Sequence, residues 1–379
     1  MVQTNPFTPQ SGLEPKFFSG RENALSEFIS LLKEGKVGRA EHLLIIGEWG
    51  IGKTALLRQF KKIAQREGCW VAYCGVNKGE RKESVVSQLR LILEEIMLVL
   101  PLRDEEVNLL RKELDFKQKE FFPLQIRLAQ FFLHIWNRMQ FPLAFILLDD
   151  VQNFLPRVEI IDLLRATLSR EDVIGKTKFC FVLSSTPEGW NNFLDKHDPI
   201  GRFFRRKVIL EPFNREEVFR FIEGSLEGTG IDFTSQIKER IFLFTRGHPY
   251  ELQLLCSNLF DAQLNGVVDE NSWEVALRNT LRDLGREYFE VLYHKASERE
   301  KELISIFMEK NSPLSLQDLR SIMILERRAK NFPIANIKNF VYRLVDKGLL
   351  KKREDNTYVL LDNLFREYLL RFKSDEARD

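Results

Sequence analysis

The sequence has little of what marks secreted, membrane-spanning or strongly basic proteins. Only four of its 379 residues are cysteines, none in a metal-type pair, so we expect buried thiols in a reduced, cytoplasmic protein. No apolar run is longer than a strand, and the polar N-terminus MVQTNPFTPQSG has no apolar core, so we expect neither a membrane span nor a signal peptide. The formal net charge is only +2, so a nucleic-acid site would have to be local.

Short apolar segments alternate with helical segments over the first half of the chain. The expected strands cover residues 42–47, 69–76, 142–150, 178–186 and 206–213. The expected helices cover residues 21–33, 54–68, 83–100, 121–139 and 156–169. Continuously apolar strands that alternate with helices indicate a buried parallel sheet. The expected fold class is therefore α/β, with a five-stranded parallel sheet.

Strand signals stop after Pro212, and helical patterns follow at residues 214–226, 234–245, 248–264 and 270–290. From Ser297 three helical stretches precede two short strands around the turn Glu354-Asp355-Asn356, which is the winged-helix order. The expected domains are a loose N-terminal arm (1–16), an α/β core (17–213), a helical lid (214–292) and a winged helix (293–379).

The stretch LLIIGEWGIGKTALL fits the pattern G-x-x-x-x-G-K-[ST]. Its fixed positions are Gly47, Gly52, Lys53 and Thr54, and Gly50 is an additional glycine. A glycine backbone can curl so that successive N–H groups point at a polyphosphate, and the following helix adds its positive N-terminal end. The stretch therefore predicts a phosphate-binding loop, with Lys53 on the β and γ phosphates and the Thr54 hydroxyl on Mg²⁺.

A distant strand, FILLDD, ends on two adjacent acids. Unpaired buried carboxylates are costly, so we expect Asp149 to hold Mg²⁺ through water and Asp150 to orient the attacking water. The 96 residues from Lys53 to Asp149 leave room for a complete strand between the two motif strands. That arrangement is typical of additional-strand P-loop ATPases, not of kinases or GTPases. No N-K-x-D-like guanine reader follows the fourth strand, which favours ATP.

Three further stretches accompany these motifs: FFSGRENALSEFISLL before the loop, DPIGRFFRRKVILEPFNREEV after the fourth strand, and TRGHPYELQLL in the expected lid. They are similar to the h-x-G-R-E-x-E-L, P-L-x-G-R with L-x-P-F, and G-x-P motifs of archaeal-type ATPases. These belong with the STAND and origin-recognition-like branches of the AAA+ superfamily. The resemblance covers about residues 17–290 and suits a C-terminal winged helix.

The resemblance implies where ATP is held. Phe18, Gly20 and Arg21 would border the adenine, and His248 and Pro249 would close over the base from the lid. The loop would consist of Gly47, Glu48, Trp49, Gly50, Ile51, Gly52, Lys53, Thr54 and Ala55. For His248 a purely structural, helix-capping role is the alternative.

The resemblance also implies a sensor and an arginine finger. Ser184 or Ser185 would contact the γ-phosphate or the water, and Arg202 would be the finger for a neighbouring subunit. Arg205 and Arg206 are nearby substitutes, unless all three arginines form a solvated basic face. Asp150 stands where Glu is usual in AAA+ machines, which fits a slow switch. The ending SST replaces the common Asn, and Arg246 is the one candidate for a sensor-two arginine.

The C-terminal segment leaves DNA binding open. Residues 298–379 contain 17 Lys and Arg against 14 Asp and Glu, a weak basic surplus for a DNA-binding module. The cations nevertheless gather around the expected recognition helix and wing. They are Arg327, Arg328, Lys330, Lys338, Arg343, Lys347, Lys351, Lys352 and Arg353. The alternative is a protein-interaction or packing module.

We therefore expect a cytoplasmic, Mg²⁺-dependent AAA+/STAND-type ATPase that self-associates with nucleotide. Double-stranded DNA is the expected partner of the winged helix, in a replication, transposition or repair type of role. The alternative is a signalling or defence switch whose winged helix binds a protein client.

Overall fold

The computed structural model describes residues 4–10, 14–77, 85–113, 121–154, 159–196, 199–264, 266–326 and 336–373. The chain forms two compact units. We call Gly20–Glu211 the sheet unit, and Met1–Ser19 together with Pro212–Asp379 the helical unit.

The sheet unit is built on five parallel strands, as predicted. These are β1 (Leu43–Ile46), β2 (Trp70–Gly75), β3 (Ala144–Asp149), β4 (Phe179–Ser185) and β5 (Arg206–Ile209). Their order across the sheet is β2-β3-β4-β1-β5. The strand β4, which ends in Ser184 and Ser185, lies between β1 and β3. The carboxyl end of β1, which leads into the phosphate loop, and that of β3, which ends at Asp149, therefore lie on either side of these two serines. The fifth strand is shorter than the predicted 206–213.

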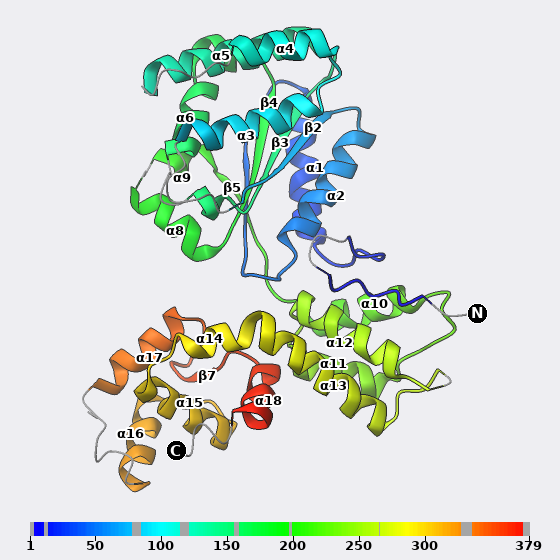
Figure 1. The fold of residues 1–379 in the computed structure, drawn as a ribbon, viewed down its shortest axis with the longest axis vertical. Helices are drawn as coiled ribbons and strands as arrows, with labels where there is room; N and C mark the ends of the chain where they lie inside the picture. Colours follow the sequence, from blue (N-terminus) through cyan, green and yellow to red (C-terminus); the bar gives the residue numbers. More distant parts are fainter. Residues whose placement is uncertain are drawn as a thin grey trace. The chain divides into compact units, whose positions relative to one another are not determined.

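Helices cover both faces of this sheet (Figure 1). They are α1 (Glu22–Lys36), α2 (Lys53–Arg66), α3 (Val85–Leu98), α4 (Asp104–Glu113), α5 (Phe121–Arg138), α6 (Glu159–Leu168), α7 (Glu171–Ile174), α8 (Pro187–Lys196) and α9 (Pro199–Phe203). On one face Phe28 of α1 stacks on Phe60 of α2 at 4.1 Å and meets Phe145 of β3 at 5.0 Å between ring centroids. On the other face Ile146 belongs to a core shared with α3, α5 and α6. Alternate strand residues thus feed two buried layers.

The helical unit begins with α10 (Arg215–Leu226), α11 (Ser235–Thr245), α12 (Pro249–Ala262) and α13 (Glu270–Leu284). A π turn (Gly285–Phe289) leads into α14 (Glu290–His294). The last elements are α15 (Glu298–Lys310), α16 (Leu316–Leu325), α17 (Ile337–Asp346), the antiparallel hairpin of β6 (Leu350–Lys352) and β7 (Tyr358–Leu360), and α18 (Asn363–Phe372). Three helices therefore precede a two-stranded hairpin, in the expected order.

The N-terminal arm is not loose where it is described. Phe7 is 3% exposed and belongs to the core of α10–α13, stacked on Phe233 with ring centroids 6.3 Å apart. The Asn5 amide donates to the Ser257 carbonyl at 3.0 Å and to Asp261 Oδ1 at 2.8 Å. The polar sequence of the arm concealed these two anchors, because a single Phe and a single Asn give no periodic signal.

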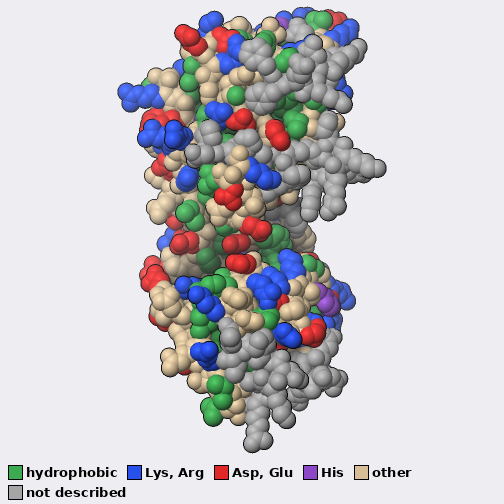
Figure 2. Space-filling model, turned by 90° about the vertical axis from the view of Figure 1, so that its left-hand side faces the viewer, with side chains coloured by type: hydrophobic (Ala, Val, Ile, Leu, Met, Phe, Trp, Pro, Cys, Tyr) green, Lys and Arg blue, Asp and Glu red, His purple; other side chains and the backbone are tan. Residues whose placement is uncertain are grey.

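Charged side chains of both signs are mixed over the face shown in Figure 2, in keeping with the small net charge. All four cysteines are buried and free, as expected for reduced thiols. Among the described helices, none combines the length and the apolar character needed to cross a membrane.

Candidate active site

The phosphate loop joins β1 to α2, as the sequence predicts. Gly50 and Gly52 have φ values of 71° and 98°, in the left-handed region that favours glycine. Gly47 lacks room for a side chain, since a Cβ there would lie 2.6 Å from Ile51 Cγ2. Its amide donates to the Ser185 carbonyl at 3.1 Å and so fixes the start of the loop against β4.

Lys53, the first residue of α2, folds back over the loop. Its ammonium donates to the carbonyl oxygens of Gly47 and Glu48, both at 2.9 Å, and the side chain is buried. Burial lowers the pKa of Lys53, while the charges of Asp150, Asp149 and Glu48 oppose that shift. Two neutral carbonyls are weak partners for a buried cation, so the lysine is poised for an anion at the loop.

Asp149, at the end of β3, is the centre of the site. Its Oδ2 accepts hydrogen bonds from Thr54 Oγ1 at 2.6 Å and from the Tyr73 hydroxyl at 2.8 Å. Its Oδ1 accepts from the Ser184 hydroxyl. The residue is 3% exposed, and these three donors compensate for the burial of its charge. The structure thus brings the predicted metal ligands Thr54 and Asp149 into direct contact.

Asp150 is displayed on a strained backbone with φ of 57°. Its amide donates to Ser184 Oγ at 2.9 Å, and its Oδ1 accepts from Gln152 Nε2 at 3.0 Å. Gln152 in turn accepts from the Thr186 amide at 3.3 Å. This network fixes the second acid at the carboxyl edge of the sheet, beside Asp149.

The predicted sensor and finger residues have different surroundings. The Ser184 hydroxyl donates to Asp149 and accepts from the Asp150 amide, and Ser185 Oγ donates to the Thr186 carbonyl at 3.1 Å. Arg202 on α9 is exposed and forms no ion pair with any described residue. Its guanidinium is therefore accessible, as an arginine finger for a neighbouring subunit would have to be.

Arg206 is wrong as a substitute finger. Its guanidinium pairs with Glu27 and Glu34, each at 2.8 Å, and with Glu41. These three carboxylates, with burial acting against them, raise its pKa above the usual arginine value. The residue ties β5 to α1, and its role is structural.

Arg21 contacts the phosphate loop itself. It has φ of 70°, and its guanidinium donates to the Ile51 carbonyl at 2.9 Å and to the Glu211 carbonyl at 2.6 Å. Gly20 beside it also has a positive φ of 71°, whereas Phe18 is half-buried in the segment before the sheet unit. The GRE stretch thus positions the loop backbone, a role that the sequence did not reveal.

The lid motif GHP has a structural basis in the helical unit. A Cβ on Gly247 would lie 1.9 Å from the Phe213 carbonyl oxygen, and the Phe213 amide donates to the Gly247 carbonyl at 2.8 Å. His248 is the N-cap residue of α12, and Pro249 is its first residue, where proline is favoured. The motif starts α12, while its contact with adenine stays a prediction.

The cations predicted to meet DNA divide into three groups. Arg327, Arg328 and Lys330 lie outside the described residues. Arg343 and Lys347 both pair with Glu300 of α15, at 3.2 and 2.6 Å, and their contact with DNA stays a prediction. Lys338, Lys351, Lys352 and Arg353 are exposed.

Sequence reasoning missed Tyr73 and Gln152. Tyr73 lies near the end of β2, the neighbour of β3 in the sheet. A polar side chain near the carboxyl end of a neighbouring parallel strand was the available signal. Gln152 follows the acids in a 3₁₀ turn (Val151–Phe154), whose conformation the sequence did not indicate.

The AAA ATPase domain family matches residues 18–179. An uncharacterized HTH-type transcriptional regulator of Methanocaldococcus jannaschii is 19% identical over 393 residues, covering 97% of this chain and 93% of that protein. The Aeropyrum pernix ORC2 protein in its ADPNP–ADP complexes superposes with a TM-score of 0.66 at 16% identity, over 98% of both chains. A Walker-type ATPase of Pyrococcus abyssi gives 0.62 at 15%, over 94% of this chain and 97% of that one. These two structures establish a shared fold.

Proposed function

We propose that this chain, which carries an AAA ATPase domain and has the fold of the archaeal origin-recognition-like AAA+ ATPases, is a Mg²⁺-dependent switch that binds and hydrolyses ATP. The observation that carries the proposal is the 2.6 Å hydrogen bond between Thr54 Oγ1 and Asp149 Oδ2, beside the buried Lys53. Residues separated by 95 positions in the sequence meet where a P-loop enzyme holds its metal and phosphates.

The donor set fits Mg²⁺ bound together with a polyphosphate. Magnesium prefers oxygen ligands and keeps several waters, so one carboxylate, one hydroxyl and phosphate oxygens suffice. Within the described part of the chain no cluster of three or more His, Cys, Asp or Glu side chains forms a self-contained metal cage. A metal here therefore depends on the nucleotide.

The residues of the site take distinct roles. Lys53 exchanges its two carbonyl partners for phosphate oxygens, which match its charge better. Thr54 and Asp149 would hold the metal, which would supply positive charge to neutralise that of the phosphates. Asp150, oriented by Gln152 and Ser184, accepts a hydrogen bond from the attacking water. Ser184 then positions both acids and is not itself the phosphate sensor.

We propose slow turnover that depends on self-association. Asp150 is one methylene shorter than the glutamate usual in AAA+ machines, which reduces its reach toward the water. The exposed Arg202 supplies the finger to a neighbouring subunit, where it neutralises charge in the transition state. We also propose that His248 and Pro249 close over the adenine when ATP binds.

We further propose contact with double-stranded DNA through α17 and the β6–β7 hairpin, as a winged helix. Four exposed cations support it: Lys338, Lys351, Lys352 and Arg353. The name of the M. jannaschii relative, an HTH-type regulator, agrees with this direction. Pairing of Arg343 and Lys347 with Glu300 instead favours the alternative, a signalling switch whose C-terminal module binds a protein client.

Hydrolysis tests the first proposal. Wild type should release phosphate from ATP in the presence of Mg²⁺, and Asp150→Asn should reduce kcat at least about 100-fold, within the range for a positioned acid–base group. Asp195→Asn, an exposed acid on α8, is the matched control. Equal rates for wild type and Asp150→Asn would contradict the assignment.

The dependence of ATP turnover on protein concentration tests the assignment of Arg202 as the arginine finger. Wild-type turnover per subunit should rise with concentration, whereas Arg202→Ala should stay low throughout and Arg206→Ala should lose stability. An Arg202→Ala variant that matched wild type at every concentration would remove the finger role.

DNA contact is tested by fluorescence anisotropy with a labelled duplex. Lys351→Glu/Lys352→Glu should weaken binding uniformly across sequences and lower the salt slope by about two, roughly one per cation. Binding without salt dependence, or unaffected by these changes, would favour the protein-interaction alternative.

A further inference from the structure

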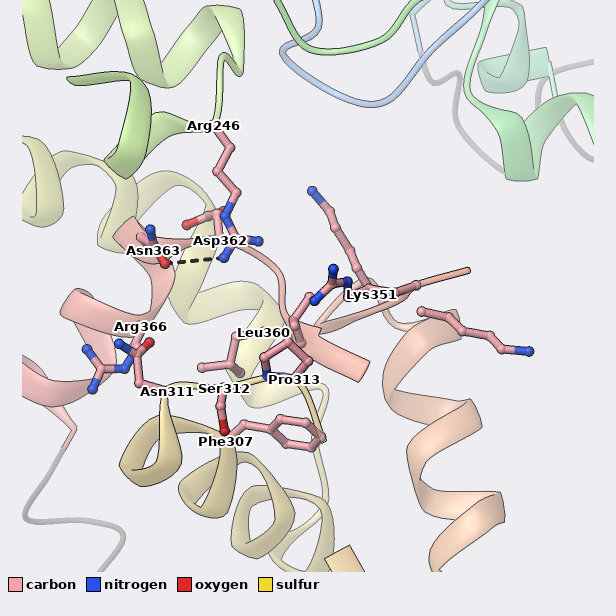
Figure 3. Close-up of a pocket in the computed structure, with 13 residues that line it drawn as sticks. Arg246, Phe307, Asn311, Ser312, Pro313, Lys351, Leu360, Asp362, Asn363 and Arg366 are labelled. Carbon is pink, nitrogen blue, oxygen red and sulfur yellow. Dashed lines mark hydrogen bonds between the residues drawn. The ribbon is translucent and has the colours of Figure 1, made fainter. Parts of the chain in front are cut away.

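A cavity of about 440 Å³ opens in the helical unit, beside the β6–β7 hairpin (Figure 3). Its walls come from the end of α11, the loop after α15, the hairpin and the start of α18. Five cationic side chains line it: Arg246, Lys351, Lys352, Arg353 and Arg366. Asp362 is the single acidic side chain in this lining. Cations from three segments of the chain, namely the end of α11, the hairpin and α18, therefore converge on one hollow.

Most of these cations lack an anionic partner. Lys351, Lys352 and Arg353 form no ion pair with any described carboxylate. Arg246 donates to the neutral Asn363 Oδ1 at 3.3 Å, drawn as a dashed line in Figure 3. Arg366 is oriented by the Met308 carbonyl at 3.0 Å, and its pair with Glu367 is long, at 3.7 Å. The positive charge of the hollow is therefore only partly compensated, through the charge interactions of Arg246 and Lys351 with Asp362 and of Arg353 with Asp355.

The one acid of the lining does not supply the missing charge. Asp362 is buried and shares a hydrogen bond with the buried Glu251 of α12. Burial, together with the neighbouring carboxyl, raises the pKa of Glu251 well above its usual value, and burial raises that of Asp362. Both raised pKa values favour the protonated forms, so the pair offsets less of the positive charge of Arg246 and Lys351 than two ionised carboxylates would.

The backbone at the rim also points to a ligand. Arg246 is the C-cap residue of α11 and has φ of 48°, where glycine or asparagine is usual. Arginine at this position brings its guanidinium to the cavity, where Figure 3 shows it reaching toward the same space as Lys351.

We infer that this cavity binds a phosphate group, either of a free nucleotide or of a nucleic-acid backbone. Guanidinium and ammonium groups are the side chains that recognise phosphate oxygens, and a dianion matches this charge better than a single carboxylate does. Phe307, Pro313 and Leu360 add apolar surface at its base, and the volume lies in the usual range for small-ligand sites. All residues that line the cavity belong to the helical unit, whereas the phosphate loop belongs to the sheet unit.

Calorimetric titration with pyrophosphate, without Mg²⁺, tests the inference. Lys53→Ala should lose the phosphate-loop site and keep a second site on the helical unit. Adding Lys351→Gln/Arg353→Gln to that variant should weaken the remaining site at least about tenfold, since charged hydrogen bonds contribute about 1.5–3 kcal/mol each. Lys295→Gln, an exposed cation outside the cavity, is the control and should change nothing.

Two results would overturn the inference: no pyrophosphate binding by Lys53→Ala, or binding that the cavity changes leave intact while circular dichroism shows a folded chain. Competition experiments identify the molecule that carries the phosphate. Displacement of pyrophosphate by a DNA duplex identifies a backbone phosphate, whereas displacement by a mononucleotide alone identifies a free one. Lys338→Gln separates this site from the proposed DNA surface, because it should weaken duplex binding without affecting pyrophosphate.

Discussion

Asp149 accepts hydrogen bonds from three hydroxyl groups, and each hydroxyl belongs to a different element: Thr54 of α2, Tyr73 of β2 and Ser184 of β4. A buried carboxylate held in this way has a fixed orientation before any ligand arrives. If Thr54 turned to a metal on nucleotide binding, as proposed, Tyr73 and Ser184 would be the donors that keep the carboxylate in place.

This arrangement predicts a specific effect of Tyr73→Phe. The phenol hydroxyl should persist as a donor, because burial and the Asp149 charge raise the pKa of Tyr73 above its usual value. Removing it should raise the Mg²⁺ concentration for half-maximal ATPase activity by about tenfold or more, as for other residues that orient metal ligands. Tyr250→Phe, which removes a comparable hydrogen bond to Glu287, is the control and should leave Mg²⁺ dependence unchanged. Identical Mg²⁺ curves for Tyr73→Phe and wild type would contradict this role.

At the scale of elements, Glu300 connects α15 to α17. It is 1% exposed, closes the capping box of α15 with Ser297, and pairs with Arg343 and Lys347. Burial alone would raise the pKa of Glu300, but the hydrogen bonds from Lys347 and Ser297 outweigh it and hold the pKa below its usual value. The cations of α17 thereby stabilise the packing of the helices.

We predict that Glu300→Gln lowers the free energy of unfolding by about 1–3 kcal/mol, because it leaves two cations without their carboxylate. Since the folded pKa is lowered, the ionic contribution is complete above the unfolded value of 4.5 and is lost as pH falls through the folded value. Urea unfolding at pH 7 and at pH 3 should show a large difference between variant and wild type at pH 7 and a smaller one at pH 3. Glu298→Gln, an exposed neighbour, should change little at either pH. An equal effect of Glu300→Gln at both pH values would count against the ion pairs.

The helices and strands of the chain show how much of the structure could be predicted from the sequence. Long periodic helices, apolar strands and the P-loop pattern are local signals, and the five strands and the contact of Thr54 with Asp149 followed from them. The ion pair of Arg343 was not predicted, because its partner Glu300 lies 43 positions earlier on another helix and no local pattern reveals such a pair. The helices α4, α7, α8, α9 and α18 were not predicted; α7 and α9, with four and five residues, are too short to show a helical period.

At the scale of the whole molecule, the helical unit contains two hydrophobic cores joined by a buried pair of acids. Glu251 lies on α12, in the part built from α10–α13, and Asp362 is the N-cap residue of α18 in the C-terminal part. The groups that face the pair are Arg246, His248 and Lys351. Because the pKa values of both buried carboxyls are raised, we expect the stability of this junction to depend on pH.

The sign of that dependence is set by the raised pKa of Glu251. The folded state retains a proton that the unfolded chain releases above about pH 4.5, so the stability contributed by the pair falls as pH rises toward the folded value. Glu251→Gln replaces the shared proton with an amide donor to Asp362. We predict that it flattens the fall in thermal midpoint between pH 6 and pH 9 and raises the midpoint at pH 9. Glu216→Gln, exposed on α10, is the control. A Glu251→Gln variant with the pH profile of wild type would show that no proton is shared.

The central claim is that Thr54 and Asp149 together make ATP binding dependent on Mg²⁺. The most direct measurement is calorimetric titration of ATP with and without Mg²⁺ for wild type, Thr54→Ala and Asp149→Asn, with Thr8→Ala as a control. We predict that Mg²⁺ tightens ATP binding to wild type and to the control at least about tenfold, and that the gain largely disappears in both site variants. ATP affinity that is independent of Mg²⁺ in wild type, or a full Mg²⁺ gain in Thr54→Ala and Asp149→Asn, would contradict the account.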